Sequence, residues 1–306
     1  MVETGKVSVI VNCRNGEKYL LSALESILSQ SYENLEVIFW DNQSTDHSAK
    51  IFKSISDVRF RYFYAPTFTN LYSARNLAIE KSVGELIAFL DVDDWWEPFK
   101  LARQVKLFES ADVGLVYSNY YRYEESSKIT KTVFKAPLPS GNLTNQLIQN
   151  YQVGLLTIVV RKRAFEYVSG FTGKYNIIGD FDFVIRISSN YKIGVVSEPL
   201  AFYRWHDENL SKTNTGQTVA EFEDWKITIE KDNPAIYIEN STSIARLISY
   251  HRAVDETLSG TKIKAIMSAF RTFSAQKIII ILVFNLVPVT KLKKLLGRVK
   301  SIIQGS

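Results

Sequence analysis

Residues 86–94 read Leu-Ile-Ala-Phe-Leu-Asp-Val-Asp-Asp, and this stretch decides most of what can be inferred about the fold. Its first five residues form an uninterrupted apolar run, which is typical of a strand buried on both faces. The run leads directly into Asp91, Asp93 and Asp94. Carboxylates crowded at a strand end repel one another unless a cation neutralises them, and hard oxygen ligands suit Mg²⁺ or Mn²⁺. The stretch predicts a metal site at a strand end; the alternative is a solvated turn that only opens the next helix.

Strand-like and helix-like patterns alternate on the N-terminal side of this stretch. Residues 7–11 and 35–40 are apolar and strand-like, whereas the leucines and isoleucines of residues 20–28 recur at helical spacing. Residues 58–63 predict a further strand and residues 74–81 a further helix. This alternation is typical of an α/β fold in which helices cover a mainly parallel sheet in a three-layer sandwich.

A second polar cluster follows the predicted strand 35–40. Ligands of parallel sheets bind beyond the carboxyl ends of the strands, where this cluster, Asp-Asn-Gln-Ser-Thr-Asp, is expected to lie. Asp41 and Asn42 can accept hydrogen bonds from a base N–H group or a ribose hydroxyl. Alternatively, Ser44 or Asp46 only caps the next helix.

Two further segments contain candidate catalytic groups. Asp180 follows Gly179, which permits an unusual backbone angle, and neighbouring phenylalanines can raise the pKa of its carboxyl towards that of a general base. The alternative is the start of a surface helix, with Asp182 and Arg186 paired one turn apart. His206 ends the segment Tyr-Arg-Trp-His and can complete a metal site, although a lone histidine is usually structural.

The composition excludes several classes of protein. A chain of 306 residues with 46% hydrophobic and 23% charged residues is not disordered as a whole. Cys13 is the single cysteine, which excludes an internal disulfide framework and a zinc site built from cysteines. Residues 1–13 contain an early Glu3 and an apolar run too short for a signal peptide, so the sequence predicts a cytoplasmic protein.

The net charge of +5 is unevenly distributed. Nine of the 37 Lys and Arg residues fall in residues 257–306, which contain no Asp or Glu. The rest of the chain therefore holds 28 basic against 32 acidic residues, a net charge of −4. A body with this charge is not expected to bind nucleic acid.

The basic segment 257–306 also shows helical apolar periodicity. Apolar side chains recur every three or four residues and alternate with basic ones, most clearly at Leu292, Leu295, Leu296, Val299, Ile302 and Ile303. The apolar run 278–284 is too short to span a bilayer, which needs roughly 20 such residues. The pattern predicts amphipathic helices that bind an anionic membrane surface. The alternative is packing on the catalytic body or on a second chain in a homo-oligomer.

Four segments occur in the order seen in a known family. Residues 7–46 read VSVIVNCRNGEKYLLSALESILSQSYENLEVIFWDNQSTD, and residues 74–98 read ARNLAIEKSVGELIAFLDVDDWWEP. Residues 179–188 read GDFDFVIRIS, and residues 202–211 read FYRWHDENLS. Over roughly residues 5–211 the chain resembles glycosyltransferase family 2, whose members are inverting enzymes with the GT-A fold and nucleotide-sugar donors.

The resemblance implies donor-binding residues. Asp41 and Asn42 would border the nucleotide base and ribose, Arg75 would belong to the nucleotide pocket, and Asp91 would approach the ribose or diphosphate. Many members have Asp-Asp-Gly-Ser where this chain has Asp-Asn-Gln-Ser. The amide oxygen of Asn42 can still accept from uracil or thymine N3–H, so a UDP- or dTDP-linked donor is expected.

The resemblance also implies the catalytic groups. Asp93 would bind a divalent metal, Mn²⁺ or Mg²⁺, and His206 matches a position that joins the metal or diphosphate in some relatives. Asp180 would take the proton from the acceptor hydroxyl. The long hydrophobic spans of processive synthases are missing from the sequence, so transfer of single sugars is expected.

The expected domains follow the same resemblance. Residues 1–210 would form the GT-A catalytic domain, with a nucleotide-sugar half at 1–100 and an acceptor half at 101–210. Residues 211–256 would form a helical extension, and 257–306 the membrane-associating or oligomerising tail.

The leading hypothesis is a metal-dependent transferase of surface polysaccharide or lipid-linked glycan assembly, attached to the inner face of the cell membrane. One rival is a sugar nucleotidyltransferase, although residues 12–16 are not the Gly-rich, Arg-bearing phosphate loop that it needs. The other is a non-catalytic protein that binds carbohydrate or nucleotide sugar on the same fold. The joint presence of Asp93, Asp180 and His206 argues against it.

Overall fold

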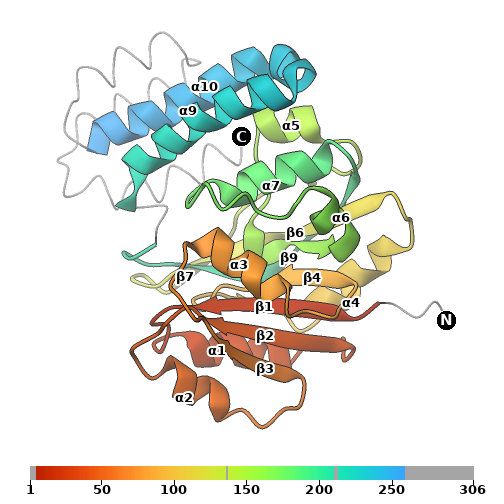
Figure 1. Ribbon diagram of the computed structural model, residues 1–306, viewed down its shortest axis with the longest axis vertical. Helices are drawn as coiled ribbons and strands as arrows, with labels where there is room; N and C mark the ends of the chain where they lie inside the picture. The colour runs from red at the N-terminus through yellow and green to blue at the C-terminus, as the bar shows by residue number, and fades with distance from the viewer. Residues whose placement is uncertain (1–4, 136, 210–212, 259–306) are drawn as a thin grey trace. The chain divides into compact units, whose positions relative to one another are not determined.

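The computed structural model describes residues 5–135, 137–209 and 213–258 (Figure 1). The chain divides into two compact units. Among the described residues, the first contains 5–133, 137–143 and 153–206, and the second contains 134–135, 144–152, 207–209 and 213–258. All the predicted site residues belong to the first unit.

The first unit is built on one sheet. Within the described residues the strand order is β3-β2-β1-β4-β8-β6-β9-β5, with β7 paired to β6. The strands are β1 (Val7–Cys13), β2 (Leu35–Asp41), β3 (Phe60–Tyr64), β4 (Leu86–Phe89), β5 (Trp95–Trp96), β6 (Val113–Glu124), β7 (Ile129–Thr132), β8 (Val159–Arg161) and β9 (Lys192–Trp205).

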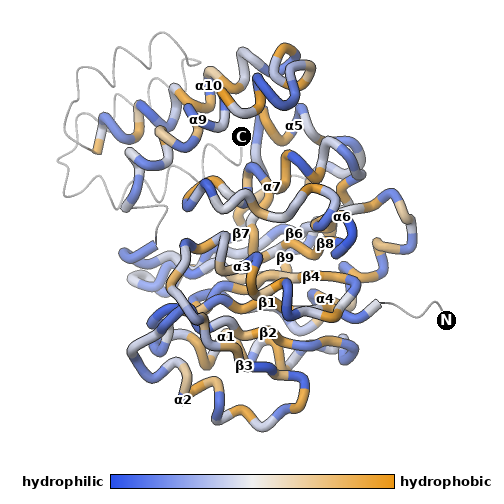
Figure 2. The backbone as a smooth tube through the Cα atoms, viewed as in Figure 1, coloured by the Kyte–Doolittle hydropathy of each residue, from blue (hydrophilic) through white to orange (hydrophobic). Residues whose placement is uncertain are grey.

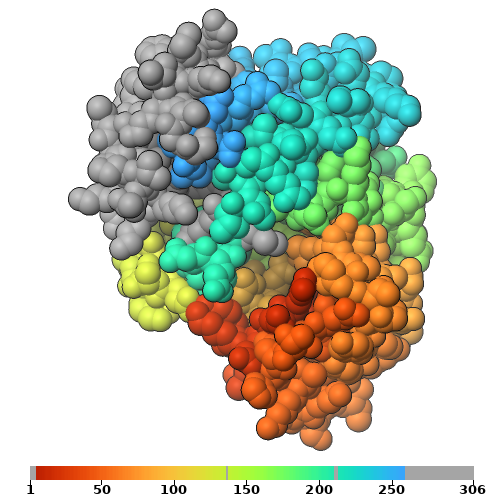
Figure 3. All heavy atoms as spheres, turned by 60° about the vertical axis from the view of Figure 1, so that its left-hand side comes forward, coloured from red at the N-terminus to blue at the C-terminus, as the bar shows by residue number. Residues whose placement is uncertain are grey.

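Strands β3, β2, β1 and β4 are parallel, as the sequence predicts for the N-terminal half. Their register pairs Cys13 with Asp41 and Asp41 with Tyr64, so the polar segments that follow these strands emerge at one edge of the sheet. Beyond β4 the sheet is mixed, because β8 runs antiparallel to both β4 and β6 while β6 and β9 are parallel. Figure 3 shows the residues of this parallel half, red to orange, as one continuous body of atoms.

Helices cover both faces of the sheet and produce the three layers that the sequence predicts. Odd-numbered residues of β1 and β2, such as Val9 and Phe39, and the even-numbered Ala88 of β4 pack with α1, α2 and α4 in one core. On the other face, Phe89 of β4 meets Phe171, whose ring contacts α3, α6 and α7. Figure 2 shows the hydrophobic colour running along the central strands. These helices are α1 (Leu20–Leu28), α2 (Ser48–Lys53), α3 (Leu71–Ile79), α4 (Lys100–Val105), α6 (Lys162–Tyr167) and α7 (Gly179–Ser188).

The boundaries of α3 matter for the site. The sequence predicts a helix over 74–81, but α3 begins three residues earlier because Asn70 caps it. The Asn70 side chain accepts a hydrogen bond from the Ser73 N–H, which is the usual contact of an asparagine N-cap. This earlier start brings Tyr72 and Arg75 onto one helical face, three residues apart.

The described residues of the second unit form helices. They are α5 (Thr144–Gln149), α9 (Thr215–Asp232) and α10 (Pro234–Leu258), of which α9 and α10 fall in the predicted C-terminal helical extension. Phe222 of α9 stacks on His251 of α10, and Asn240 of α10 donates to Asn145 of α5 at 2.7 Å. Buried Trp225 belongs to the same unit.

No helix within the described ranges is both long and apolar enough to cross a bilayer. The predicted basic segment 257–306 lies outside the described residues, apart from the last two residues of α10.

Candidate active site

Asp91 follows β4 closely and is held by an arginine from α3. The Arg75 Nη2 atom lies 2.5 Å from Asp91 Oδ1. Arg75 is almost fully buried, with 2% of its surface exposed, whereas the Asp91 side chain is 38% exposed. The predicted donor-binding pair is therefore brought together by the structure. The Nη1 atom of Arg75 has no hydrogen-bond partner among the described residues.

Asp93 and His206 meet although 113 positions separate them in sequence. His206 Nε2 lies 3.0 Å from Asp93 Oδ2, and the two side chains are 10% and 26% exposed respectively. The ring of Tyr19 packs on the imidazole, with 5.3 Å between centroids. The two residues predicted to hold a metal thus form a carboxylate–imidazole pair, placed just after β4 and at the end of β9.

Asp94 and Arg204 bring that pair together. The backbone N–H of Arg204 donates to Asp94 Oδ1 at 2.8 Å, and the Arg204 Nε–H donates to the carbonyl oxygen of Asp93 at 2.8 Å. Burial, together with the charges of Asp93 and Asp91, raises the pKa of the Asp94 carboxyl well above its usual value. Asp94 therefore fixes the turn, and its oxygen is occupied by the backbone of β9.

These residues fit a divalent ion that shares its coordination with a substrate. Within the part of the chain that the structure describes, no group of three or more His, Cys, Asp or Glu side chains is placed to hold a metal. Mg²⁺ and similar ions are commonly bound by one or two protein ligands, with diphosphate oxygens and water completing the shell. Asp93, with His206 beside it, is compatible with that arrangement.

Asp41 and Asn42 are buried and use their side chains to build loops. Asp41 accepts from the Ser44 N–H at 2.7 Å and from the Tyr62 hydroxyl at 2.6 Å. Asn42 exchanges two hydrogen bonds with the backbone of Thr69, donating from Nδ2 at 2.8 Å and accepting at Oδ1 at 3.2 Å. Both residues shape the edge of the sheet, and their predicted contacts with a base or ribose stay a prediction.

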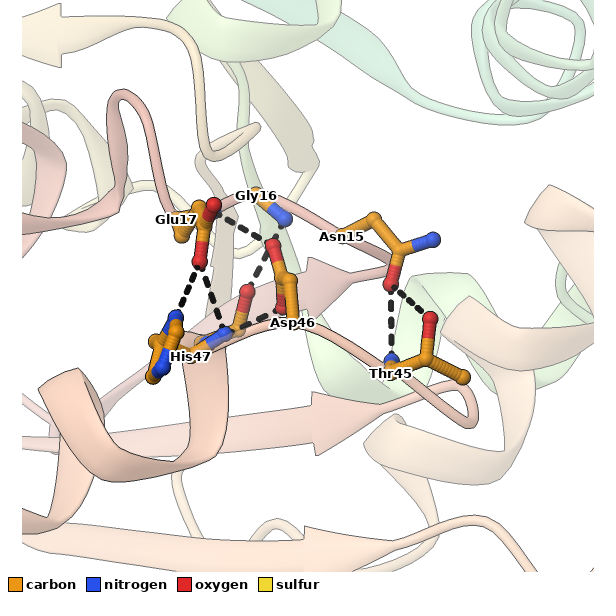
Figure 4. A network of polar contacts seen from close by, with 7 residues as sticks. Asn15, Gly16, Glu17, Thr45, Asp46 and His47 are labelled. Atoms are coloured by element: carbon orange, nitrogen blue, oxygen red, sulfur yellow. Dashed lines mark hydrogen bonds and ion pairs between the residues drawn. The ribbon is translucent and has the colours of Figure 1, made fainter.

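Reciprocal contacts tie the loop after β1 to the loop after β2 (Figure 4). Asn15 Oδ1 accepts from the Thr45 N–H at 2.8 Å, and Asp46 Oδ2 accepts from the Glu17 N–H at 2.9 Å. Glu17 Oε2 accepts in turn from the His47 N–H at 2.8 Å. We call this set of contacts the loop clasp. Asp46 also accepts from the N–H of the first residue of α2 at 3.0 Å, but the N-cap of α2 is His47, whose side chain makes no capping hydrogen bond.

Sequence reasoning missed two buried polar side chains at this edge. Asn12 of β1 lies opposite Trp40 of β2 in the register. The amide atoms of Asn12 and the Nε1 atom of Trp40 are buried and have no hydrogen-bond partner among the described residues. Leaving a buried polar group unpaired costs about 1–3 kcal/mol, so these atoms mark a place where a ligand or water is expected. The sequence feature that could have revealed Asn12 is its position directly after the apolar run 7–11.

Asp180 is the second residue of α7 and has unusual surroundings. Its Oδ1 atom accepts from the Phe181 N–H at 2.9 Å and from the Tyr72 hydroxyl at 3.3 Å. Burial raises the pKa of the carboxyl to about 6, and these hydrogen bonds and Arg75 oppose the shift. A carboxyl with this pKa can be ionised near neutral pH and still accept a proton.

Asp182, the alternative carboxylate, is bound to Arg186. Its Oδ2 atom accepts from Arg186 Nε at 3.0 Å and from Nη2 at 2.7 Å, as the spacing of four residues predicts. Gly179 begins α7 without a positive φ, so the unusual backbone angle that a glycine permits is not used there.

Comparison with known proteins identifies the family of the chain. Residues 8–166 match the family model described as Glycosyl transferase family 2. The chain belongs to glycosyl transferase family 2. Similar proteins include an uncharacterized glycosyltransferase of Rickettsia bellii, 31% identical over 70% of this chain and 31% of its own length. Another is WfaP of Escherichia coli, described as a UDP-Glc:alpha-D-GlcNAc-diphosphoundecaprenol beta-1,3-glucosyltransferase, 36% identical over 53% of this chain. The chain covers 63% of WfaP.

Solved structures show that the family 2 chain has the GT-A fold. The structure of S. aureus TarS 1-349 in complex with UDP-GlcNAc superposes with a TM-score of 0.69 at 18% identity, and the match covers 98% of this chain and 89% of the TarS 1-349 chain. The mannosyltransferase PcManGT from Pyrobaculum calidifontis, in complex with GDP-Man and Mn²⁺, gives a TM-score of 0.65 at 16% identity, covering 98% and 86% of the two chains. At these identities the likeness concerns the fold.

Proposed function

We propose that this chain is an inverting, metal-dependent glycosyltransferase that moves a single sugar from a nucleotide-sugar donor to an acceptor hydroxyl. One observation carries the proposal: a single face of α3 contacts both a donor-side carboxylate and a carboxyl suited to act as a base. Arg75 binds Asp91, and Tyr72, three residues earlier, binds Asp180.

The donor side of the proposal uses the edge formed by β1, β2 and β4. Asp91 is partly exposed there, and Arg75 limits its movement. The Nη1 atom of Arg75 and the amide of Asn12, which have no hydrogen-bond partner among the described residues, would form hydrogen bonds with the nucleotide. Asp41 and Asn42 shape the same edge, which supports their assignment to the base and ribose. Asn42 favours a UDP- or dTDP-linked donor.

Asp93 would hold the divalent ion, with His206 joining it or the diphosphate. Mn²⁺ or Mg²⁺ at this place would neutralise charge that develops on the leaving diphosphate. The Mn²⁺ in the PcManGT structure supports this part of the proposal by analogy of fold.

Asp180 would act on the acceptor. Its carboxylate takes the proton from the acceptor hydroxyl as the hydroxyl oxygen attacks the anomeric carbon, and the bond to the leaving nucleoside diphosphate breaks. A single displacement inverts the anomeric configuration. Asp182 is unsuited to this role, because Arg186 binds it and only 3% of its surface is exposed.

The acceptor we propose is a lipid-linked glycan. This follows from WfaP, whose name specifies a sugar linked through diphosphate to a polyprenol. We further propose that the enzyme works at the inner face of the cell membrane, with residues 257–306 contacting anionic lipid or a second copy of the chain.

A donor screen tests the proposal. UDP-glucose, UDP-GlcNAc, dTDP-glucose and GDP-mannose are offered with Mn²⁺ and a short-chain GlcNAc-diphosphate lipid, and nucleoside diphosphate release is measured. The anomeric configuration of the product is then read by NMR spectroscopy. Turnover that is lost on chelation, with an inverted product, is expected. A retained configuration refutes the proposed mechanism.

Two outcomes of related assays distinguish the rival functions. Donor binding without turnover for any acceptor supports a non-catalytic binding protein. Formation of a nucleotide sugar from a nucleoside triphosphate and a sugar 1-phosphate supports a nucleotidyltransferase.

A further inference from the structure

A tyrosine of α3 reaches the carboxyl group of the proposed base. The Tyr72 hydroxyl donates to Asp180 Oδ1 at 3.3 Å, from a residue 108 positions away in sequence. The tyrosine is buried, with 4% of its surface exposed, and its ring packs on Phe171 at 5.0 Å between centroids. Since the ring is fixed by its packing, the hydroxyl holds the carboxyl group from outside α7.

Gly179 provides the space for this contact. A Cβ atom added at Gly179 would lie 2.5 Å from the Cδ2 and Cε2 atoms of the Tyr72 ring, a distance that Cβ atoms essentially never show. Gly179 is therefore required for the close approach of the ring and not for its backbone angle. The residue immediately before Asp180 thus leaves room for the residue that binds Asp180.

The Tyr72 ring also contacts a cation. The guanidinium carbon of Arg75 lies 4.9 Å from the centre of the Tyr72 ring, and the same guanidinium binds Asp91. Tyr72 is thus in contact with a donor-side ion pair as well as with the carboxyl. The titratable and charged groups that act on Asp180 are Tyr72 and Arg75 from α3 and Tyr120 from β6.

We propose that Tyr72 is a positioning residue for the transfer reaction: its hydroxyl, with the ring packed against Gly179, aims the Asp180 carboxylate at the acceptor hydroxyl. The inference rests on the proposed function, because it takes Asp180 as the base.

Tyr72→Phe tests the inference, since it removes the hydroxyl and keeps the ring. With the donor and acceptor that support turnover in the screen, kcat is expected to fall about tenfold, as for one lost hydrogen bond to a charged group, while KM for the donor stays unchanged. The Tyr72 hydrogen bond favours the ionised form of the Asp180 carboxyl and so lowers its pKa. Its loss should raise that pKa and move the acid limb of the profile of kcat against pH to higher pH. Tyr117→Phe is the matched control, because that buried tyrosine donates to the Pro139 carbonyl at 2.8 Å.

A second measurement needs no substrate. Because the pKa of Asp180 is raised to about 6 in the folded protein, the folded state binds more protons than the unfolded state between about pH 4 and pH 6. The raised pKa therefore stabilises the folded state at low pH, and this stabilisation is lost as pH rises through the range. Asp180→Asn removes this pH dependence of the unfolding free energy. The difference in unfolding free energy between wild type and Asp180→Asn reports the titration. In a Tyr72→Phe background its midpoint should shift to higher pH.

Gly179→Ala tests the contact between Tyr72 and Asp180 in a second way, because the added methyl group displaces the Tyr72 ring. Its effect on kcat should be smaller in the Tyr72→Phe background, because part of the interaction is already gone.

The outcomes separate this inference from the proposed function. If Asp180→Asn is inactive and Tyr72→Phe matches Tyr117→Phe in kcat and pH profile, the inference is overturned and the base assignment stands. If Asp180→Asn keeps its turnover, both are overturned.

Discussion

At the scale of single residues, the crowded aspartates after β4 have different tasks. Asp91 is bound to Arg75, Asp93 faces His206, and Asp94 is buried against the backbone of Arg204. The sequence pattern predicts a common cation for all of them, but position in the turn separates their environments. A substitution in this segment should therefore affect a different property at each position.

We predict that Asp93→Ala abolishes metal-dependent donor binding and leaves the fold intact. Asp93 is partly exposed, so its loss leaves no large cavity, whereas the proposed ion loses its carboxylate ligand. Isothermal titration with UDP and Mn²⁺ measures the effect, and circular dichroism checks the fold. Glu97→Ala, a change in the same segment outside the site, should bind normally. Undiminished, EDTA-sensitive turnover of Asp93→Ala would refute the assignment.

For the base, we predict that Asp180→Asn lowers kcat by ~10²–10⁴-fold, the usual contribution of a general base. Donor affinity should barely change, because the residue acts on the acceptor. Asp182→Asn is the comparison: it breaks the pair with Arg186 and should lower thermal stability more than turnover. Should Asp182→Asn lose turnover while Asp180→Asn keeps it, the wrong aspartate has been chosen.

At the scale of helices and strands, local pattern predicted most elements and missed the contacts between them. The apolar runs at 7–11 and 35–40 correspond to β1 and β2, because a buried strand needs little more than its own apolar side chains. The pairing of Asp93 with His206 and of Tyr72 with Asp180 depends on chain segments more than 100 residues apart, and spacing carries no information about it. The candidate residues were accessible from the sequence, and the family resemblance placed Asp93 and His206 at one metal, but the contact of Tyr72 with Asp180 was not accessible.

Helix α4 carries a fully buried lysine whose charge should affect stability. Lys100 donates to Gln104 Oε1 at 2.8 Å and lies 4.2 Å from the Trp96 ring centre, and burial lowers the pKa of its amine well below the usual value. Between the folded pKa and the unfolded value of about 10.4, the unfolded state binds more protons, so stability rises with pH.

Lys100→Met should remove this dependence. The unfolding free energy of wild type minus that of the variant is expected to rise by at most about 1.4 kcal/mol per pH unit within the window. Urea denaturation at pH 7, 8 and 9 measures it. Lys192→Met, which removes a half-exposed lysine paired with Asp112, should show no such trend. If the unfolding free energies of wild type and Lys100→Met change with pH in parallel, the prediction is contradicted.

At the scale of the whole molecule, charge is segregated along the chain. Residues 257–306 contain nine basic and no acidic residues, whereas the remainder has a net charge of −4. A basic segment is attracted to the negative surface potential of an anionic lipid bilayer.

We predict that the full chain sediments with vesicles of phosphatidylglycerol and phosphatidylethanolamine at low salt, and that a chain ending at residue 256 does not. Binding should weaken as salt is raised, since exposed charges are screened beyond about 10 Å at 0.1 M. Neutral phosphatidylcholine vesicles are the control. If the full chain does not bind anionic vesicles, and the truncated chain has a different oligomeric state from the full chain, residues 257–306 are a protein interface.

The loop clasp has a consequence for the thermodynamics of donor recognition. Backbone N–H groups of one loop bind carboxylate and amide oxygens of the other, so the two loops constrain each other before any nucleotide arrives. Ordering a loop residue on binding costs about 1–2 kcal/mol of conformational entropy. Here the loops are already ordered when the chain folds, so this cost is not part of donor binding. The donor should meet an edge that is already preorganised. Loosening the clasp with Asp46→Ala would then weaken binding through entropy, at nearly constant enthalpy.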